Sequence, residues 1–154
     1  MHIENEVKYD FSDVLIKPKR SYYTSRKEVD LERDFKFKWS NLSWKGIPIV
    51  AANMDTVGTI GSAEVLSKHK VLTCLHKFHT ADELLKITSG IKKNVAITIG
   101  VAEGLQILYE LGEQIKDFNF ICIDVANGYT EQFCDFIKQA RSEFENKIII
   151  AGNV

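Results

Sequence analysis

The chain repeats one unit, a short apolar run followed by a segment with helical periodicity. Five apolar, strand-prone runs recur, at residues 47–54, 71–76, 94–101, 119–125 and 147–154. Such runs are typical of strands buried on both faces, and starts spaced by roughly 23 to 29 residues leave room for one helix in between. Repeated strand–helix units build parallel sheets through right-handed crossovers. The sequence therefore predicts an α/β fold.

Three segments between these runs carry helix signals. The clearest is an apolar stripe at helical spacing, made of Phe133, Phe136, Ile137, Ala140 and Phe144. A second stripe consists of Leu105, Leu108, Leu111 and Ile115. Thr80–Glu83 has the form of a capping box, which starts a helix by satisfying its free N–H groups. We expect these helices to pack an apolar face on the sheet.

Two α/β architectures contain this repeat. A doubly wound open sheet usually carries a glycine-rich phosphate turn, and no G-x-G-x-x-G motif follows any of the runs. A (β/α)₈ barrel tolerates varied loops and needs about 250 residues. The 154 residues hold five strand–helix units and end on a strand. We therefore expect residues 46–154 to be a (β/α)₈ TIM-type barrel, truncated after about five strands.

Residues 1–45 differ in texture from the rest of the chain. They are highly charged, lack a sustained helical period, and contain the basic run Lys17–Arg20, which we interpret as solvated surface. Phe35–Trp39 alternates apolar and polar residues, which is typical of a strand with one buried face. We expect a β-rich, hairpin-like N-terminal extension packed on the barrel.

The overall charge argues against two classes of partner. A formal net charge of −1 and a pI near 6.4 lack the basic imprint of proteins that bind nucleic acids or anionic membranes. No apolar run approaches the roughly 20 residues of a membrane-spanning helix. The polar, acidic start is unlike a signal peptide. We expect a cytoplasmic protein with no nucleic-acid or membrane partner.

Cysteine and histidine usage predicts no disulfide framework and no metal site. Cys74, Cys122 and Cys134 are an odd number at wide spacings, and each lies in an apolar stretch, so we expect small core residues. His76 and His79 resemble half of a zinc site, but no further Cys or His pair lies at a suitable spacing.

Polar residues gather where the predicted strands end. In a barrel the active site lies at the C-terminal ends of the strands. Four of these ends carry Lys, Asp or Asn, at residues 51–58, 75–77, 124–129 and 151–154, whereas 99–101 is bland. Taken singly, such residues often terminate strands or cap helices. Four polar ends together favour a site for a polar substrate, where a lysine beside a carboxylate could relay protons.

The motifs at these ends resemble GMP reductases, the close relatives of IMP dehydrogenases. They are Ala51–Gly58, His76–Lys77, Asp124–Tyr129 and Ala151–Val154, with Asp10–Arg20 upstream, and the resemblance covers essentially the whole chain. IMP dehydrogenases generally carry a regulatory domain after the second helix, whereas a short segment joins His79 to Asn94 here. Asp124–Gly128 also looks like the reductase version. A dehydrogenase relative without the insert remains the alternative.

The resemblance implies NADPH-dependent reductive deamination of GMP to IMP and ammonia. In the family, a cysteine attacks C2 of the purine and expels ammonia, leaving a covalent thioimidate that is then reduced by NADPH. That cysteine, its K⁺-binding loop and the GMP phosphate loops would all follow Val154. The family is usually homotetrameric. We therefore expect the 154 residues alone to be inactive, or to be a non-catalytic half-barrel that acts as a binding or scaffold module.

The family's catalytic and cofactor residues carry over to several positions. Lys77 and Asp124 match the catalytic polar pair near departing ammonia and the nicotinamide. With Val125 and Ala126 they also match the contacts to the dinucleotide.

The resemblance implies two further pairs of contacts. Ser25 and Arg26 match a pair that reaches the adenosine end of NADPH in a neighbouring subunit, where the Arg26 guanidinium would suit the 2′-phosphate. Met54 and Asn153 are expected to line the purine side.

Overall fold

The computed structural model describes residues 4–154, in two units that divide between Asp30 and Leu31. The N-terminal unit contains two 3₁₀ turns, η1 (Phe11–Asp13) and η2 (Arg26–Glu28). The expected extension of residues 1–45 begins at residues 1–3, outside the described residues, and its packing on the barrel stays a prediction. The second unit already includes residues 31–45.

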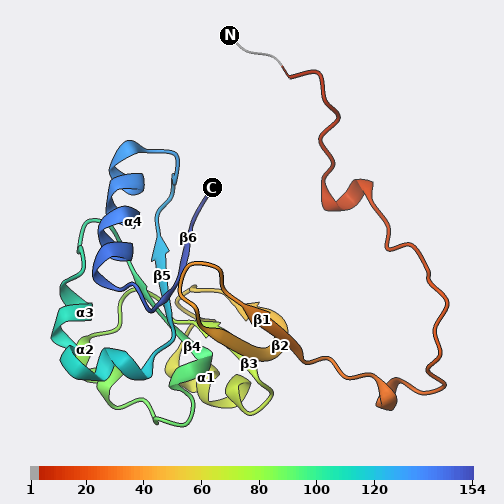
Figure 1. The fold of residues 1–154 in the computed structure, drawn as a ribbon, viewed down its shortest axis with the longest axis horizontal. Coiled ribbons are helices and arrows are strands. Elements are labelled where there is room, and N and C mark those ends of the chain that lie inside the picture. The colour runs from red at the N-terminus through yellow and green to blue at the C-terminus, as the bar shows by residue number, and fades with distance from the viewer. Residues whose placement is uncertain (1–3) are drawn as a thin grey trace. The chain divides into compact units, whose positions relative to one another are not determined.

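The second unit is built on one six-stranded sheet whose strands follow the order of the sequence (Figure 1). Its strands are β1 (Arg33–Lys36), β2 (Ser43–Ala51), β3 (Val71–Cys74), β4 (Val95–Ile99), β5 (Phe120–Asp124) and β6 (Ile148–Gly152). β1 pairs with β2 antiparallel, and β2 to β6 are all parallel. Each predicted run forms one parallel strand, so the predicted α/β fold is confirmed.

Strand β2 belongs to two different pairings. Its first residues pair with β1, where Phe35 lies opposite Trp44, and its later residues pair with β3 from Ile47 onward. The predicted strand at 47–54 therefore begins earlier and stops at Ala51. The strand expected through Trp39 ends at Lys36, because the chain turns at residues 38–40. The alternation continues one step further, since Phe37 is half-buried, whereas Trp39 is exposed.

The helices cover one face of the sheet, as their apolar stripes predict. They are α1 (Ile60–Ser67), α2 (Ala81–Leu85), α3 (Gln106–Glu110) and α4 (Glu131–Glu143), with the 3₁₀ helices η3 (Lys92–Asn94) and η4 (Gly112–Asp117). α4 buries Phe133, Phe136 and Ala140. The second predicted stripe is buried too, but it is divided between α3 and η4. Gly112, with a φ of 51°, interrupts the helix there.

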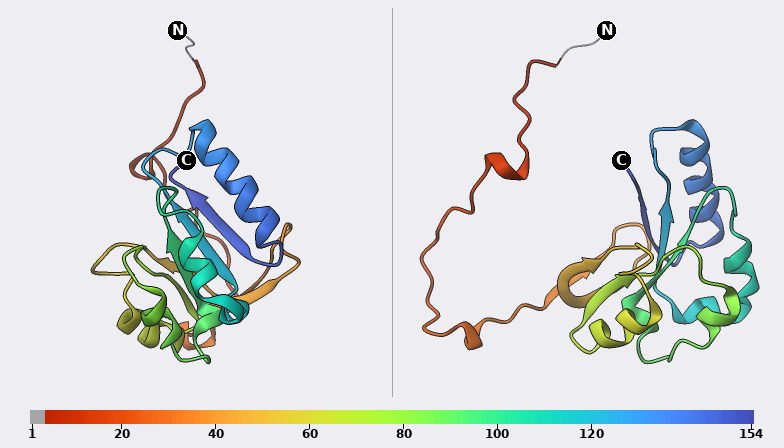
Figure 2. Two further views of the ribbon diagram at one scale, coloured as in Figure 1. Left: turned by 90° about the vertical axis from the view of Figure 1, so that its left-hand side faces the viewer. Right: turned by 180° about the vertical axis from the view of Figure 1, so that it is seen from behind.

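Two apolar clusters lie on opposite faces of the parallel strands. The helices cover one of these two faces (Figure 2). Successive strand residues point to alternate faces. Ile121 and Ile123 therefore pack against the helices, whereas Phe120 and Cys122 belong to the cluster on the other face, called here the inner cluster. Trp44 of the β1–β2 hairpin packs edge-to-face on Phe120 in that inner cluster.

The cysteines follow this division, with one correction. Cys74 and Cys122 are buried in the inner cluster, as expected of core residues. Cys134 is exposed, so its predicted core role is wrong. It follows Phe133 on α4, and a rotation of about 100° per residue turns it away from the buried stripe.

A buried lysine holds the turn before β6. Lys147 is 9% exposed, and its Nζ donates to the carbonyl oxygens of Ile115 and Phe118, both at 2.7 Å. Burial lowers the pKa of Lys147, opposed by nearby Asp117. The lysine therefore ties the end of η4 to the strand that follows α4.

Replacing this lysine is expected to destabilise the fold. Lys147→Met keeps the aliphatic stem but removes the ammonium donor from two carbonyl oxygens, of which Ile115 O keeps its bond from Phe118 N at 3.2 Å. We expect the free energy of unfolding to fall by about 2 kcal/mol. Denaturant titration measures the loss. Lys138→Met is the control, since Lys138 is exposed and pairs with Asp135, and its change is expected to stay within about 0.5 kcal/mol. Equal effects of the two substitutions would refute the structural role of Lys147.

Among the helices of the described residues, none is long and apolar enough to cross a membrane.

Candidate active site at the C-terminal ends of the strands

The parallel strands bring the predicted site residues to one edge of the sheet. Lys77 follows β3, Asp124 ends β5, and Asn153 follows β6. Lys77 and Asn153 are exposed, and Asp124 is half-buried. β4 lies between β3 and β5, and no ion pair between Lys77 and Asp124 is found within residues 4–154. The two charged side chains therefore lie at the same edge of the sheet but form no ion pair with each other.

The loop after β2 folds over the end of β3. The Gly58 carbonyl accepts from His76 N at 2.8 Å, and Gly58 N donates to Met54 O at 2.7 Å. A Cβ on Gly58 would overlap the carbonyl oxygen of Cys74 and lie only 2.9 Å from that of Ala52. A glycine is required here by close approach of the main chain. Met54, expected at the purine side, is 61% exposed in this loop.

The loop after β5 is joined to the end of β6 in a similar way. Val125 N donates to Gly152 O at 2.8 Å, and Gly128 N donates to Asn153 O at 2.7 Å. A Cβ on Gly128 would stand 2.7 Å from that oxygen. The main-chain N–H of Val125 is thus hydrogen-bonded to the last residue of β6. The small side chain of the next residue, Ala126, is exposed.

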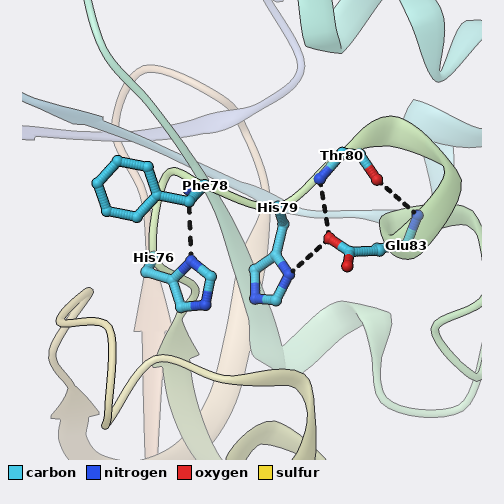
Figure 3. A network of polar contacts seen from close by, with 5 residues as sticks. All are labelled: His76, Phe78, His79, Thr80 and Glu83. Atoms are coloured by element: carbon cyan, nitrogen blue, oxygen red, sulfur yellow. Dashed lines mark hydrogen bonds and ion pairs between the residues drawn. The ribbon is translucent and has the colours of Figure 1, made fainter.

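The loop after β3, which carries Lys77, is closed by its own side chains (Figure 3). Phe78 N donates to His76 Nδ1 at 3.3 Å, and the His76 and His79 rings stack with centroids 3.9 Å apart. His79 Nδ1 lies 3.2 Å from Glu83 Oε2. The rings therefore face each other and do not converge on a metal. No group of three or more His, Cys, Asp or Glu side chains within residues 4–154 is arranged to hold one.

The capping box predicted at Thr80–Glu83 is confirmed. Thr80 Oγ1 accepts from Glu83 N at 3.4 Å, and Glu83 Oε2 accepts from Thr80 N at 3.0 Å. The backbone N–H of Thr80, followed by the His79 ring, holds the pKa of Glu83 below its usual value. The same carboxylate oxygen thus starts α2 and holds His79.

The edge of the sheet formed by the C-terminal ends of the parallel strands is called here the rim. The end of β4, where the sequence has no Lys, Asp or Asn at residues 99–101, also places a carboxylate at this rim. The Glu103 carboxylate lies against Gly100, where any Cβ would overlap it. A pocket of about 330 Å³ opens between the loop of Lys77, the end of β4 and α3, and it is lined by Lys77, Gly100 and Glu103 among others. The only signal in the sequence for a functional residue here is the glycine-bounded turn Gly100–Gly104. Such a turn does not predict the direction of the Glu103 side chain.

Ser25 and Arg26 belong to the N-terminal unit. Both are exposed, and Ser25 Oγ caps η2 by accepting from Lys27 N at 3.3 Å. Their contact with a cofactor stays a prediction.

The fold and this rim define an α/β-barrel domain with a polar site at the C-terminal ends of its strands. The sequence model of the family described as "IMP dehydrogenase / GMP reductase domain" matches residues 8–154. The chain belongs to the IMP dehydrogenase/GMP reductase family.

Individual relatives agree with this assignment. The chain is 47% identical over 159 residues to the GMP reductase of Klebsiella pneumoniae subsp. pneumoniae, covering 100% of this chain and 46% of that protein. It is 47% identical over 162 residues, with the same coverage, to the GMP reductase of Buchnera aphidicola subsp. Schizaphis graminum. The chain thus spans less than half the length of these relatives.

A solved structure shows the same fold. The crystal structure of inosine 5′-monophosphate dehydrogenase from Legionella pneumophila superposes with a TM-score of 0.71 at 26% identity, over 94% of this chain and 43% of that one. The expected fold, the first five strands of a TIM-type barrel, is therefore confirmed.

Proposed function

We propose that the chain supplies part of the active site of an NADPH-dependent GMP reductase. The observation that carries the proposal is the shared edge that brings together Lys77 of the β3 loop and Asp124 of β5. Relatives named GMP reductase match the whole chain. The proposed reaction is GMP + NADPH + 2 H⁺ → IMP + NH₄⁺ + NADP⁺.

The rim residues fit a dinucleotide. Asp124 and Val125 are half-buried, and Ala126 is small and exposed. A flat ring can therefore approach the main chain after β5 without meeting a large side chain. We propose that Lys77, Asp124, Val125 and Ala126 hold the nicotinamide end of NADPH, which supplies the reducing equivalent when bound. Met54 and Asn153 are proposed to lie on the purine side.

The roles of Lys77 and Asp124 follow from the charge of the leaving group. Ammonia leaves a purine carbon only if a proton reaches its nitrogen, and a positioned acid–base pair typically contributes about 10²–10⁴-fold to such a step. The Lys77 ammonium group is a proton donor, and the Asp124 carboxylate can accept a hydrogen bond from departing ammonium. Their separation across β4 leaves room for the ligand between them.

The nucleophile is proposed to be none of the cysteines in this chain. Cys74 and Cys122 are buried in the inner cluster below the rim. A hydrogen bond with Cys122, and then burial, raise the pKa of the Cys74 thiol, which opposes formation of the reactive thiolate. Cys134 is on the outer side of α4. The attacking cysteine and the K⁺ site would come from the part of the protein that matches the rest of the relatives.

IMP dehydrogenase is the second candidate function. The Legionella pneumophila enzyme shares the fold over 94% of this chain. The chain joins β3 to β4 through α2 and η3 alone, with no regulatory domain inserted between residues 79 and 94. That connection supports the reductase.

A homotetrameric assembly and a cytoplasmic location are also proposed from the family resemblance.

An assay of the whole protein tests this proposal. With GMP and NADPH, we expect loss of NADPH absorbance together with equal amounts of IMP and ammonia. Oxidation of IMP in the presence of NAD⁺, with no reaction of GMP and NADPH, would identify the dehydrogenase. Absence of both activities in the folded, complete protein would favour the non-catalytic scaffold.

Arg26 gives a test of cofactor selectivity. If its guanidinium grips the 2′-phosphate of NADPH, Arg26→Ala in the whole protein should raise the KM for NADPH about tenfold or more and leave that for NADH nearly unchanged. Lys27→Ala is the control, since Lys27 is also exposed on η2. Equal weakening of both cofactors by Arg26→Ala would refute the role.

A further inference from the structure

The loop that carries Lys77 is held by side chains that follow it in the sequence, and one of them, His79, lines the same pocket as Lys77. We propose that His79 and Glu83 are positioning residues that fix the main chain of Lys77 at the end of β3. This proposal rests on the proposed function, because it assigns a purpose to these residues only if Lys77 acts in the reaction.

Lys77 needs such support because its own side chain has no anchor in the described unit. It is exposed, and its Nζ lies over the Phe78 ring at 5.8 Å from the centroid, with no hydrogen bond or ion pair to it found within residues 31–154. A lysine side chain has about 2 kcal/mol of rotamer entropy to lose when it is held in one place. Before a ligand binds, the placement of Lys77 therefore depends on the main chain on either side of it.

That main chain is fixed at its first end by the sheet. His76 N donates to Gly58 O at 2.8 Å, which secures the residue before Lys77 to the loop after β2. Phe78 N, on the other side of Lys77, donates to His76 Nδ1 at 3.3 Å. These two bonds fold the loop back on His76, so the orientation of the His76 ring controls the position of the residues that follow.

The His76 ring is in turn held by His79. The rings are 3.9 Å apart and inclined by only 14°, and the His79 side chain is only 12% exposed (Figure 3). A carboxylate only accepts hydrogen bonds, so His79 Nδ1 must carry the proton that is shared with Glu83 Oε2 at 3.2 Å. The other ring nitrogen, Nε2, is buried and has no partner in the described residues. The bond to Glu83 and the stack on His76 therefore orient His79.

Glu83 completes the chain of contacts because it is fixed by its own helix. The oxygen that receives the His79 proton also caps α2 through Thr80 N, at 3.0 Å. The first turn of α2 is thus linked through Glu83, His79 and His76 to both neighbours of Lys77. The capping box has a second use here, which is to position a site residue.

Amide hydrogen exchange on the whole protein without ligands tests the physical link. In His79→Ala and Glu83→Ala, we expect the Phe78 amide to exchange about tenfold faster, because its acceptor ring is no longer held. His79→Phe keeps a ring to stack on His76 and is expected to recover part of the protection. Asp82→Ala is the control, because Asp82 lies in the same first turn of α2 but takes no part in the hydrogen bond to His79. Unchanged exchange in both alanine variants would overturn the proposal.

Kinetics test the purpose of the link. His79→Ala should lower kcat about tenfold or more with little change in the KM for GMP, since misplacing a catalytic group costs rate more than binding. In a Lys77→Ala background the same substitution should have no further effect on kcat. A further loss in that background would show a role independent of Lys77 and overturn the proposal.

The catalytic role of Lys77 and the positioning role of His79 and Glu83 can fail separately. If Lys77→Ala leaves kcat unchanged, the proposed role of Lys77 fails and the positioning role fails with it. If Lys77→Ala lowers kcat but His79→Ala and Glu83→Ala do not, the positioning role alone is refuted. His79→Phe remains informative if an alanine variant does not fold. If the Phe78 amide of His79→Phe exchanges at the wild-type rate but kcat is reduced, the positioning role is also contradicted.

Discussion

Lys77→Ala in the whole protein is expected to lower kcat for GMP reduction about 10²–10⁴-fold, the range typical of a lost acid–base group. The KM for GMP should change little, because Lys77 is proposed to act on departing ammonia and not to bind the ground state of the purine. Steady-state kinetics with varied GMP at saturating NADPH would separate the two constants. The exposed position of Lys77 makes a folding defect from this substitution small.

The matched control for this substitution is Lys86→Ala. Lys86 follows α2, away from the rim, and has the same charge. It is expected to retain the wild-type kcat. A Lys77→Ala enzyme as active as Lys86→Ala would refute the assignment of Lys77.

Gly58→Ala is expected to have the largest effect on stability among the glycine substitutions at the rim. The added Cβ would meet three main-chain atoms, the carbonyl oxygens of Cys74 and Ala52 and the nitrogen of His76. Main-chain atoms cannot rotate away, so the loop must lift off β3 and lose the bond from His76 N to Gly58 O. Overpacking of this kind costs about 3 kcal/mol, measurable as a lower denaturation midpoint.

Gly61→Ala tests whether the effect is specific to the close approach. Gly61 lies in α1, and a methyl group added there would have open space around it, with no heavy atom of another element within 4 Å. Alanine there is expected to stabilise the protein by about 0.5–1 kcal/mol, since it lowers the entropy of the unfolded chain. Destabilisation by both substitutions to a similar degree would contradict the close-approach account of Gly58.

The sheet could be predicted from the sequence because its signals are local. Each apolar run between polar or glycine-containing turns became one parallel strand, and the stripe Phe133–Ala140 became the buried face of α4. The capping box at Thr80 was equally local, since both of its hydrogen bonds join residues three apart. Parallel pairing then determined which strand ends meet.

Other features depend on contacts between distant residues, which periodicity does not report. The early start of β2 depends on its pairing with β1. The carboxylate of Glu103 reaches the rim because the chain turns back after Gly100. Cys134 lies in an apolar stretch of the sequence, but it is on the outward side of α4 and is exposed.

The requirement for glycine at positions 58 and 128 likewise comes from neighbouring strands. Gly58 meets the end of β3 and Gly128 meets the residue after β6. The sequence motifs contain both glycines but do not say why glycine is required. The requirement comes from the close packing of each loop on a neighbouring strand.

A double-mutant cycle on kcat tests whether Lys77 and Asp124 act together on one ligand at the shared edge of the sheet. The single substitutions Lys77→Ala and Asp124→Ala are compared with the double substitution in the whole protein. If both residues serve the same proton-transfer step, the double variant should be no more than about tenfold slower than the slower single variant. Losses that multiply fully would show that the two residues act independently, and would contradict the account.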